Sequence, residues 1–213
     1  MVKACLFDLD GVIVDTAKYH YLAWRRLANE LGFEFTEEDN ERLKGVSRMK
    51  SLEILLEIGG VSFDEETKEA MAAKKNSWYV EYISKMDSSE VLPGVIDFLT
   101  SLRENGIKIS LGSVSKNAMI ILKNTGVDKY FDAVIDGTKI THAKPDPEVF
   151  LKGAEELGVD PKECVVFEDA QAGIEAAINS GMHSVGVGSP EILGKADFVI
   201  SSFNEMSLNR LKF

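Results

Sequence analysis

Short apolar runs alternate along the chain with stretches whose apolar residues repeat at helical spacing. The first run covers residues 3–7 and leads into Asp8. Runs of this length, ended by glycine or polar residues, are typical of strands buried on both faces. Further runs predict strands at 107–111, 133–135, 164–167, 184–187 and 198–200. Helical spacing predicts helices at 95–104, 147–157 and 171–180, one that ends at Gly126, and a terminal helix over 203–211. This alternation predicts an α/β fold with a Rossmann-like parallel sheet core and helices on both faces.

A helix is also predicted directly after the first strand, over residues 16–31. Thr16, His20 and Trp24 recur every four residues, so they lie along one stripe of this helix. Such a stripe usually packs against a core, and a histidine on it is then a structural residue. His20 is also close in sequence to a pair of aspartates, which makes a role in a site equally plausible.

The chain up to residue 88 contains no further convincing strand. Helix-forming segments at 51–58 and 64–85 are separated by glycines and charged residues. We therefore expect a helical cap domain inserted into the α/β core. The predicted domains are a core of residues 1–15 and 89–213 and a cap of residues 16–88.

Composition excludes several classes of partner. The 213 residues are 45% hydrophobic, yet no apolar run approaches the roughly 18 residues of a membrane span. Acidic residues outnumber basic ones 35 to 24, giving a net charge of -11, which argues against nucleic-acid binding through a basic face. The N-terminus has no basic, apolar leader, so we expect a cytoplasmic protein. We also expect the protein to be a monomer. Cys5 and Cys164 fall in predicted strands and are expected to be buried, reduced thiols.

Polar residues follow three of the predicted strands. They are Asp8 and Asp10, Ser113 and Ser115, and Glu168 and Asp169, with Lys144 in a loop between the last two pairs. The carboxyl ends of parallel strands lie at one edge of a sheet, so these side chains should converge. Clustered carboxylates with one lysine favour a site for Mg²⁺ and phosphate. Each pair alone has a simpler explanation, as solvated acids at a strand end or as serines that cap the next helix.

The helical region contains one concentrated basic turn, residues 44–48, with the sequence KGVSR. Gly45 allows backbone N–H groups to face outward between Lys44 and Val46, and Arg48 follows. These groups can form an anion cradle. An ordinary turn between two helices is the alternative.

The motifs at the strand ends resemble those of the haloacid dehalogenase (HAD) superfamily of phosphoryl-transfer enzymes, over essentially the whole chain. The matching segments are DLDGVIVDT at residues 8–16, Ser113, Lys144-Pro145 and the Glu168-Asp169 pair. Phosphatases, phosphonatases and mutases share these motifs. A finer resemblance, to the β-phosphoglucomutase family, covers DTAKYH at 15–20, AW at 23–24, LKGVSR at 43–48, SVSKN at 113–117 and EDAQAGI at 168–174.

The resemblance implies a role for each matched residue. Asp8 would be the nucleophile that becomes an aspartyl phosphate, and Asp10 the general acid/base. The implied Mg²⁺ ligands are the Asp8 carboxylate, the Asp10 backbone carbonyl, Glu168 and Asp169. Ser113 and Lys144 would bind the transferring phosphoryl group, and Thr16 and His20 would couple cap closure to Asp10. The implied residues for the second phosphate and the sugar are Trp24, Lys44, Gly45, Val46, Arg48, Ser51, Lys75, Ser115, Lys116 and Asn117.

The expected activity is a Mg²⁺-dependent interconversion of β-D-glucose 1-phosphate and glucose 6-phosphate, with β-glucose 1,6-bisphosphate as intermediate and activator. Such a mutase must hold a bisphosphorylated sugar by either end, so it needs two anion sites, one at the strand ends and one at the 44–48 turn. A sugar-phosphate phosphatase, in which water resolves the aspartyl phosphate, needs only the first. A catalytically silent sugar-phosphate-binding regulator is a third hypothesis. The presence of both Asp8 and Asp10 counts against it, because binding alone requires no acid/base.

Overall fold

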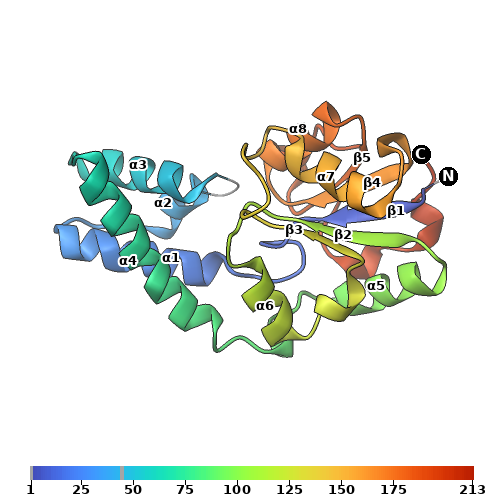
Figure 1. Cartoon of the computed structure of the whole chain (residues 1–213), viewed down its shortest axis with the longest axis horizontal. Coiled ribbons are helices and arrows are strands. Elements are labelled where there is room, and N and C mark those ends of the chain that lie inside the picture. Colours follow the sequence, from blue (N-terminus) through green and yellow to red (C-terminus); the bar gives the residue numbers. More distant parts are fainter. Residues whose placement is uncertain (1, 44–45) are drawn as a thin grey trace.

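A six-stranded parallel sheet forms the centre of the computed structural model, which describes residues 2–43 and 46–213. Its strand order is β3-β2-β1-β4-β5-β6, with β1 between the two halves of a doubly wound sheet (Figure 1). The strands are β1 Ala4–Phe7, β2 Lys108–Gly112, β3 Ala133–Ile135, β4 Cys164–Glu168, β5 His183–Val187 and β6 Phe198–Ile200. Phe7 pairs in register with Leu111 of β2 and Phe167 of β4, so these three strands end side by side. The predicted sheet is confirmed.

Helices cover both faces of the sheet because successive strand residues point to opposite sides. Cys5 and Phe7 face a core that includes residues of α5 Val95–Glu104 and α6 Ala118–Thr125. Ala4 and Leu6 face a second core, built with α7 Glu148–Leu157 and α8 Gln171–Asn179. Short helical segments complete this region: α9 Pro190–Leu193 and the 3-10 turns Ser88–Glu90, Asp128–Tyr130 and Pro161–Glu163.

Four helices form a cap region beyond the carboxyl ends of the strands (Figure 1). They are α1 Ala17–Leu31, α2 Glu37–Glu41, α3 Arg48–Gly59 and α4 Glu65–Ile83. The chain leaves the core after Val14 and returns at Val91, and these two residues form an antiparallel bridge. Both connections to the cap therefore run next to each other, immediately beyond the end of β1.

The prediction of a terminal helix over residues 203–211 is wrong. This segment forms two 3-10 turns, Phe203–Glu205 and Leu208–Arg210. The Ser202 hydroxyl accepts the Asn204 N–H at 3.3 Å, and Phe203 is buried in the core with 3% of its surface exposed. Serine and asparagine side chains compete for backbone hydrogen bonds in this way, which favours turns over continuous helix.

Both cysteines are buried and unpaired, as predicted. Across residues 2–43 and 46–213, no helix is long and apolar enough to cross a membrane.

An aromatic cluster on one face of the sheet anchors the strand that leads to Asp8. Phe7 is fully buried and stacks on Phe167 with ring centroids 4.7 Å apart, while Phe98 meets it edge-on at 6.3 Å. Such pairs add to the free energy of burial.

We expect Phe7→Ala to lower the free energy of unfolding by about 3–5 kcal/mol, because it leaves a cavity under the central strand. Denaturant unfolding followed by tryptophan fluorescence measures this change. The matched control is Phe63→Ala, at a phenylalanine with 36% of its surface exposed. Its effect should stay below about 1 kcal/mol. Equal losses in both variants would contradict the assignment of Phe7 to the structural core.

Candidate active site

Asp8 and Asp10 lie where the central strand ends and the chain turns toward the cap. Asp8 continues the sheet pattern, since its N–H donates to Phe167 O at 3.0 Å. Its side chain then turns back, and Asp8 Oδ2 accepts the Asp10 N–H at 3.0 Å. Gly11 allows the tight turn with φ +82°, a conformation that other residues rarely adopt. The local sequence thereby fixes one carboxylate at the sheet edge and places the second above it.

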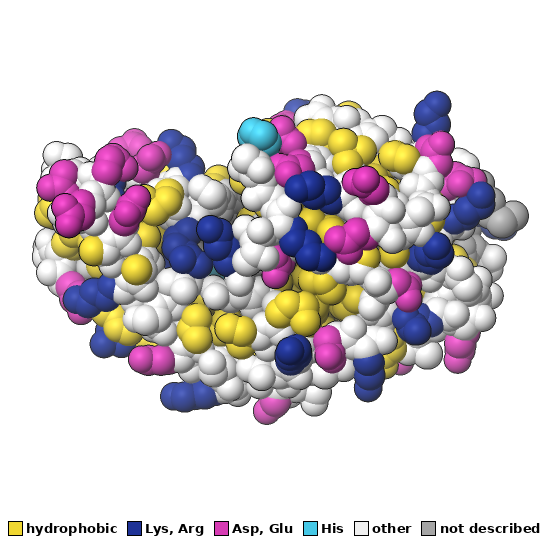
Figure 2. Space-filling model, in the orientation of Figure 1, with side chains coloured by type: hydrophobic (Ala, Val, Ile, Leu, Met, Phe, Trp, Pro, Cys, Tyr) yellow, Lys and Arg dark blue, Asp and Glu magenta, His cyan; other side chains and the backbone are white. Residues whose placement is uncertain are grey.

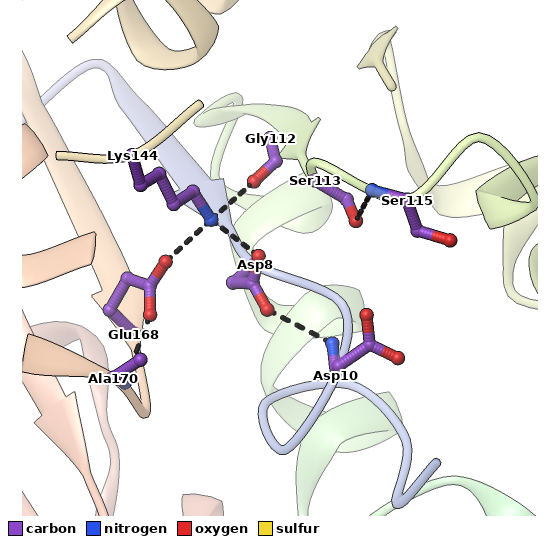
Figure 3. A network of polar contacts seen from close by, with 8 residues as sticks. All are labelled: Asp8, Asp10, Gly112, Ser113, Ser115, Lys144, Glu168 and Ala170. Carbon is purple, nitrogen blue, oxygen red and sulfur yellow. Dashed lines mark hydrogen bonds and ion pairs between the residues drawn. The ribbon is translucent and has the colours of Figure 1, made fainter. Parts of the chain in front are cut away.

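The ammonium of Lys144 lies between the ends of β2, β1 and β4 (Figure 3). It donates to Asp8 Oδ1, to Glu168 Oε1 at 2.5 Å and to the Gly112 carbonyl at 2.9 Å. Burial alone would lower the pKa of Lys144, but the charges of Asp8 and Glu168 outweigh it and raise the pKa above its usual value. Lys144 therefore stays charged and neutralises part of the acidic cluster.

The carboxylates at this edge fit a divalent cation. Asp8, Glu168 and Asp169 each offer an oxygen within 4.8 Å of the others. Burial and the neighbouring charge of Asp8 raise the pKa of Glu168 to about 7 against the opposing effect of Lys144, so one ammonium does not fully offset the repulsion between the carboxylates. An all-oxygen donor set with a surplus of negative charge is what Mg²⁺ prefers.

Two glycines leave room for these carboxylates. A Cβ added at Gly11 would lie 2.1 Å from Asp169 Oδ2, and one added at Gly173 would lie 1.9 Å from the Glu168 carboxyl group. Real atoms do not approach so closely, so the backbone of both residues is part of the site.

The loop after β2 presents hydroxyl and amide groups to the same edge. The Ser113 hydroxyl accepts the Ser115 N–H at 3.1 Å, and the Ser115 hydroxyl accepts the Asn117 N–H at 3.2 Å. Helix α6 starts at Ala118 with Asn117 in the N-cap position. Neither serine is therefore the N-cap residue, and both lie in a turn that leads from the strand end into the helix.

The first helix of the cap reaches back to Asp10. The Thr16 hydroxyl, fully buried, donates to Asp10 Oδ1. Desolvation and the nearby charge of Asp8 raise the pKa of the Asp10 carboxyl to about 6, although the Thr16 hydrogen bond opposes this rise. Asp10 can therefore take up or release a proton near neutral pH.

A buried lysine lies on the cap side of the site. Lys75 of α4 has 2% of its surface exposed, and its Nζ lies 3.0 Å from His20 Nδ1 and 4.4 Å from the centre of the Trp24 ring. Burial and the charge of Arg48 lower the pKa of Lys75 to about 7. Burial also lowers the pKa of His20 well below its usual value, helped by the charges of Lys75 and Arg48. His20 is thus held neutral beside Arg48 and a lysine that is only partly charged near neutral pH.

All of these groups surround one cavity of about 550 Å³ between cap and core. Figure 2 shows the notch between the two lobes, with lysine and arginine side chains gathered beside it. The predicted site residues that line the cavity are Asp8, Asp10, Thr16, His20, Trp24, Val46, Arg48, Ser51, Lys75, Ser115, Lys116, Asn117, Lys144, Glu168 and Asp169. Ser113 is fully buried directly behind Ser115. Lys44 and Gly45 lie outside the described residues.

Several polar residues of the cavity wall were not predicted from the sequence, among them Asn40, Asn76 and Tyr79. Asn76 and Tyr79 are one and four residues after Lys75 on α4. Residues four apart share a helix face, so the position of Lys75 could have indicated Tyr79, but residues one apart do not, and no helical spacing marks Asn76. Asn40 has no such signal, because α2 is too short to show helical periodicity.

Comparison with known proteins connects this geometry to a family. The haloacid dehalogenase-like hydrolase profile matches residues 2–181. A β-phosphoglucomutase of Bacillus subtilis is 42% identical over 99% of this chain and 94% of its own length. A phosphorylated carbohydrates phosphatase of Thermotoga maritima is 34% identical over 86% of this chain and 84% of its own.

Solved structures agree with these matches. The crystal structure of a β-phosphoglucomutase from Clostridium difficile has a TM-score of 0.94 and 46% identity to this chain, and covers 99% of this chain and 96% of that one. The sheet and the cap region of this chain therefore have the same arrangement as in that solved structure. This chain belongs to the haloacid dehalogenase superfamily.

Proposed function

We propose that this protein is a Mg²⁺-dependent mutase that interconverts β-D-glucose 1-phosphate and glucose 6-phosphate through β-glucose 1,6-bisphosphate. One observation carries the proposal: a single cavity has anion-binding groups at both ends. Lys144 lies at the core end, and Arg48 with Lys75 at the cap end. A sugar with two phosphates fits such an arrangement, and the similarity to β-phosphoglucomutases supports it.

At the core end, Asp8 acts as the nucleophile. One of its carboxylate oxygens attacks the phosphorus of the donor, and the bond from phosphorus to the sugar oxygen breaks. Lys144 orients the carboxylate, and with Ser113 it binds the equatorial oxygens of the phosphoryl group. Mg²⁺ would be held by the carboxylates of Asp8, Glu168 and Asp169 and the backbone carbonyl of Asp10. When bound, it would neutralise charge that develops on the transferring group.

Asp10 moves the proton that this exchange requires. It protonates the sugar oxygen as that oxygen leaves, and removes a proton from the acceptor hydroxyl in the reverse direction. A pKa of about 6 suits both roles near neutral pH. Thr16 holds the Asp10 carboxylate, and because Thr16 directly precedes the first cap helix, the position of the cap and that of the acid/base are linked.

At the cap end, Arg48 and Lys75 bind the second phosphate together with donors from both sides of the cavity. The further residues for the second phosphate and the sugar are Trp24, Lys44, Gly45, Val46, Ser51, Ser115, Lys116 and Asn117, while His20 with Thr16 couples cap closure to Asp10. We also assign residues 1–15 and 89–213 to a core domain and 16–88 to a cap domain that closes over the substrate. Closure would exclude water from the aspartyl phosphate.

A sugar-phosphate phosphatase is the second candidate. The 34% identical phosphatase of Thermotoga maritima favours it. Hydrolysis needs only the core end of the cavity, so the phosphatase hypothesis assigns no role to the cap end, where half-buried Arg48 lies with buried Lys75.

An assay with β-glucose 1-phosphate, Mg²⁺ and a trace of glucose 1,6-bisphosphate tests the proposal. Glucose 6-phosphate and inorganic phosphate are measured together. We expect glucose 6-phosphate to dominate, because the cap end holds the bisphosphate while it turns over. Dominant phosphate release would make the protein a phosphatase, and no turnover would favour a binding role.

Arg48→Ala should reduce mutase kcat/KM about 10- to 100-fold, the effect of losing one charge-assisted contact. Hydrolysis of a small phosphate ester should change less than about twofold, because such an ester lacks the second phosphate. Lys50→Ala is the matched control, since Lys50 is exposed on the same helix and pairs with Glu53 at 3.0 Å. Equal losses on both substrates in Arg48→Ala would remove the argument for a second phosphate site.

Asp10→Asn should lower kcat about 10²- to 10⁴-fold, the usual contribution of a general acid/base. Mg²⁺ affinity, measured by calorimetry, should change little, because the proposed ligand is the backbone carbonyl. Asp8→Asn is the comparison and should weaken Mg²⁺ binding. A large loss of Mg²⁺ affinity in Asp10→Asn would show that its side chain is a ligand instead.

A further inference from the structure

One side-chain hydrogen bond joins the middle of cap helix α4 to the core loop after β2. The Asn117 amide Nδ2 donates to Asn76 Oδ1 at 2.8 Å. Both residues are half-buried and line the cavity. The bond therefore lies inside the site and spans the boundary between cap and core.

Asn76 follows Lys75 directly on α4, so the two side chains leave the helix in different directions. Lys75 points to His20, and Asn76, the next residue, points to the loop that contains Ser115 and Asn117. The bond can form only while α4 lies against this loop. Asn76 thus contributes to the arrangement in which the cavity is covered, and loses its partner when the cap moves away.

The contact also fixes the orientation of the Asn117 amide. An asparagine side chain has two N–H donors and a carbonyl acceptor, and the two ends are easily exchanged by rotation. Since one Asn117 N–H is given to Asn76 Oδ1, its NH₂ end faces the cap. The Asn117 backbone N–H is meanwhile held by Ser115.

We propose that Asn76 is a positioning residue for phosphoryl transfer, acting through Asn117 to hold the cap over the aspartyl phosphate. The inference rests on the mutase function proposed above. Without this bond the cap opens more often while Asp8 carries the phosphoryl group, and water enters. A water oxygen then bonds to phosphorus, the bond from phosphorus to the Asp8 oxygen breaks, and Asp10 accepts the water proton. Inorganic phosphate leaves in place of a phosphorylated sugar.

The test is the partition between glucose 6-phosphate and inorganic phosphate in Asn76→Ala. Alanine favours helix more than asparagine does, so this variant is expected to fold. Loss of a neutral hydrogen bond should raise phosphate release per glucose 6-phosphate about 2- to 12-fold. We expect the effect mainly in kcat, with KM for β-glucose 1-phosphate changed less than about twofold. Phosphorylation of the enzyme by a small phosphate ester should be unaffected, because it does not require closure.

Asn124→Ala is the matched control. Asn124 also donates from α6 to α4, to the Ile83 carbonyl at 3.1 Å, but at the far end of the helix and outside the cavity. It should leave the partition unchanged. Asn117→Ala and the double variant Asn76→Ala/Asn117→Ala complete a double-mutant cycle. If Asn76 acts through Asn117, the double variant releases no more phosphate per glucose 6-phosphate than Asn117→Ala does.

The outcomes separate the two proposals. A wild-type enzyme that makes no glucose 6-phosphate overturns the mutase function and this inference together. A wild-type mutase whose partition is unchanged by Asn76→Ala, or changed equally by Asn124→Ala, overturns the inference alone. Additive effects of Asn76→Ala and Asn117→Ala also overturn it. Asn76→Asp retains an acceptor for Asn117 and should restore the partition toward wild type, and failure to do so would count against the hydrogen bond.

Discussion

The contact on which the site depends is the buried ammonium of Lys144 between Asp8 and Glu168. Carboxylates that converge at the edge of a parallel sheet repel one another in a medium of low dielectric constant, and burial alone would protonate them. Lys144 prevents this for part of the cluster, and a divalent cation supplies the remaining charge when bound. The close approach of these groups in turn requires glycine at positions 11 and 173. The charges of this cluster and the space that its side chains need therefore restrict which residues can occupy the same small part of the structure.

A second constraint is the short segment of chain that joins Asp8, at the end of the central strand, to the first helix of the cap. Asp8 ends the central strand, Asp10 follows in the turn, and Thr16 precedes the first cap helix. Because Thr16 contacts Asp10, a movement of the cap would change the surroundings of the Asp10 carboxylate directly. The return connection at Val91 lies beside Val14, so both connections sit at the same point of the core.

The sequence was informative wherever the backbone topology alone brings residues together. Parallel strands end at one edge, so the convergence of Asp8, Ser113 and Glu168 followed from three short apolar runs. Side chains of the cap wall depend instead on how α4 packs against the core, and no local pattern marks Asn76. The prediction for residues 203–211 failed for another reason: their apolar spacing suits a helix, but the Ser202 hydroxyl accepts the Asn204 N–H and Phe203 is buried, which favours the turn Phe203–Glu205.

The cap end of the cavity is positively charged although the protein as a whole is acidic. The protein has a net charge of -11, yet this region brings Arg48 close to Lys75 with His20 held neutral. Mutual repulsion and burial leave Lys75 with a pKa of about 7, so near neutral pH it is only partly charged in the empty site. A phosphate bound between the two cations would raise that pKa, since an opposite charge favours the protonated form. By linkage, binding the anion and taking up a proton then favour each other. The site would reach its full positive charge only when the anion is present, which avoids the cost of a permanently charged buried lysine beside Arg48 in the absence of substrate.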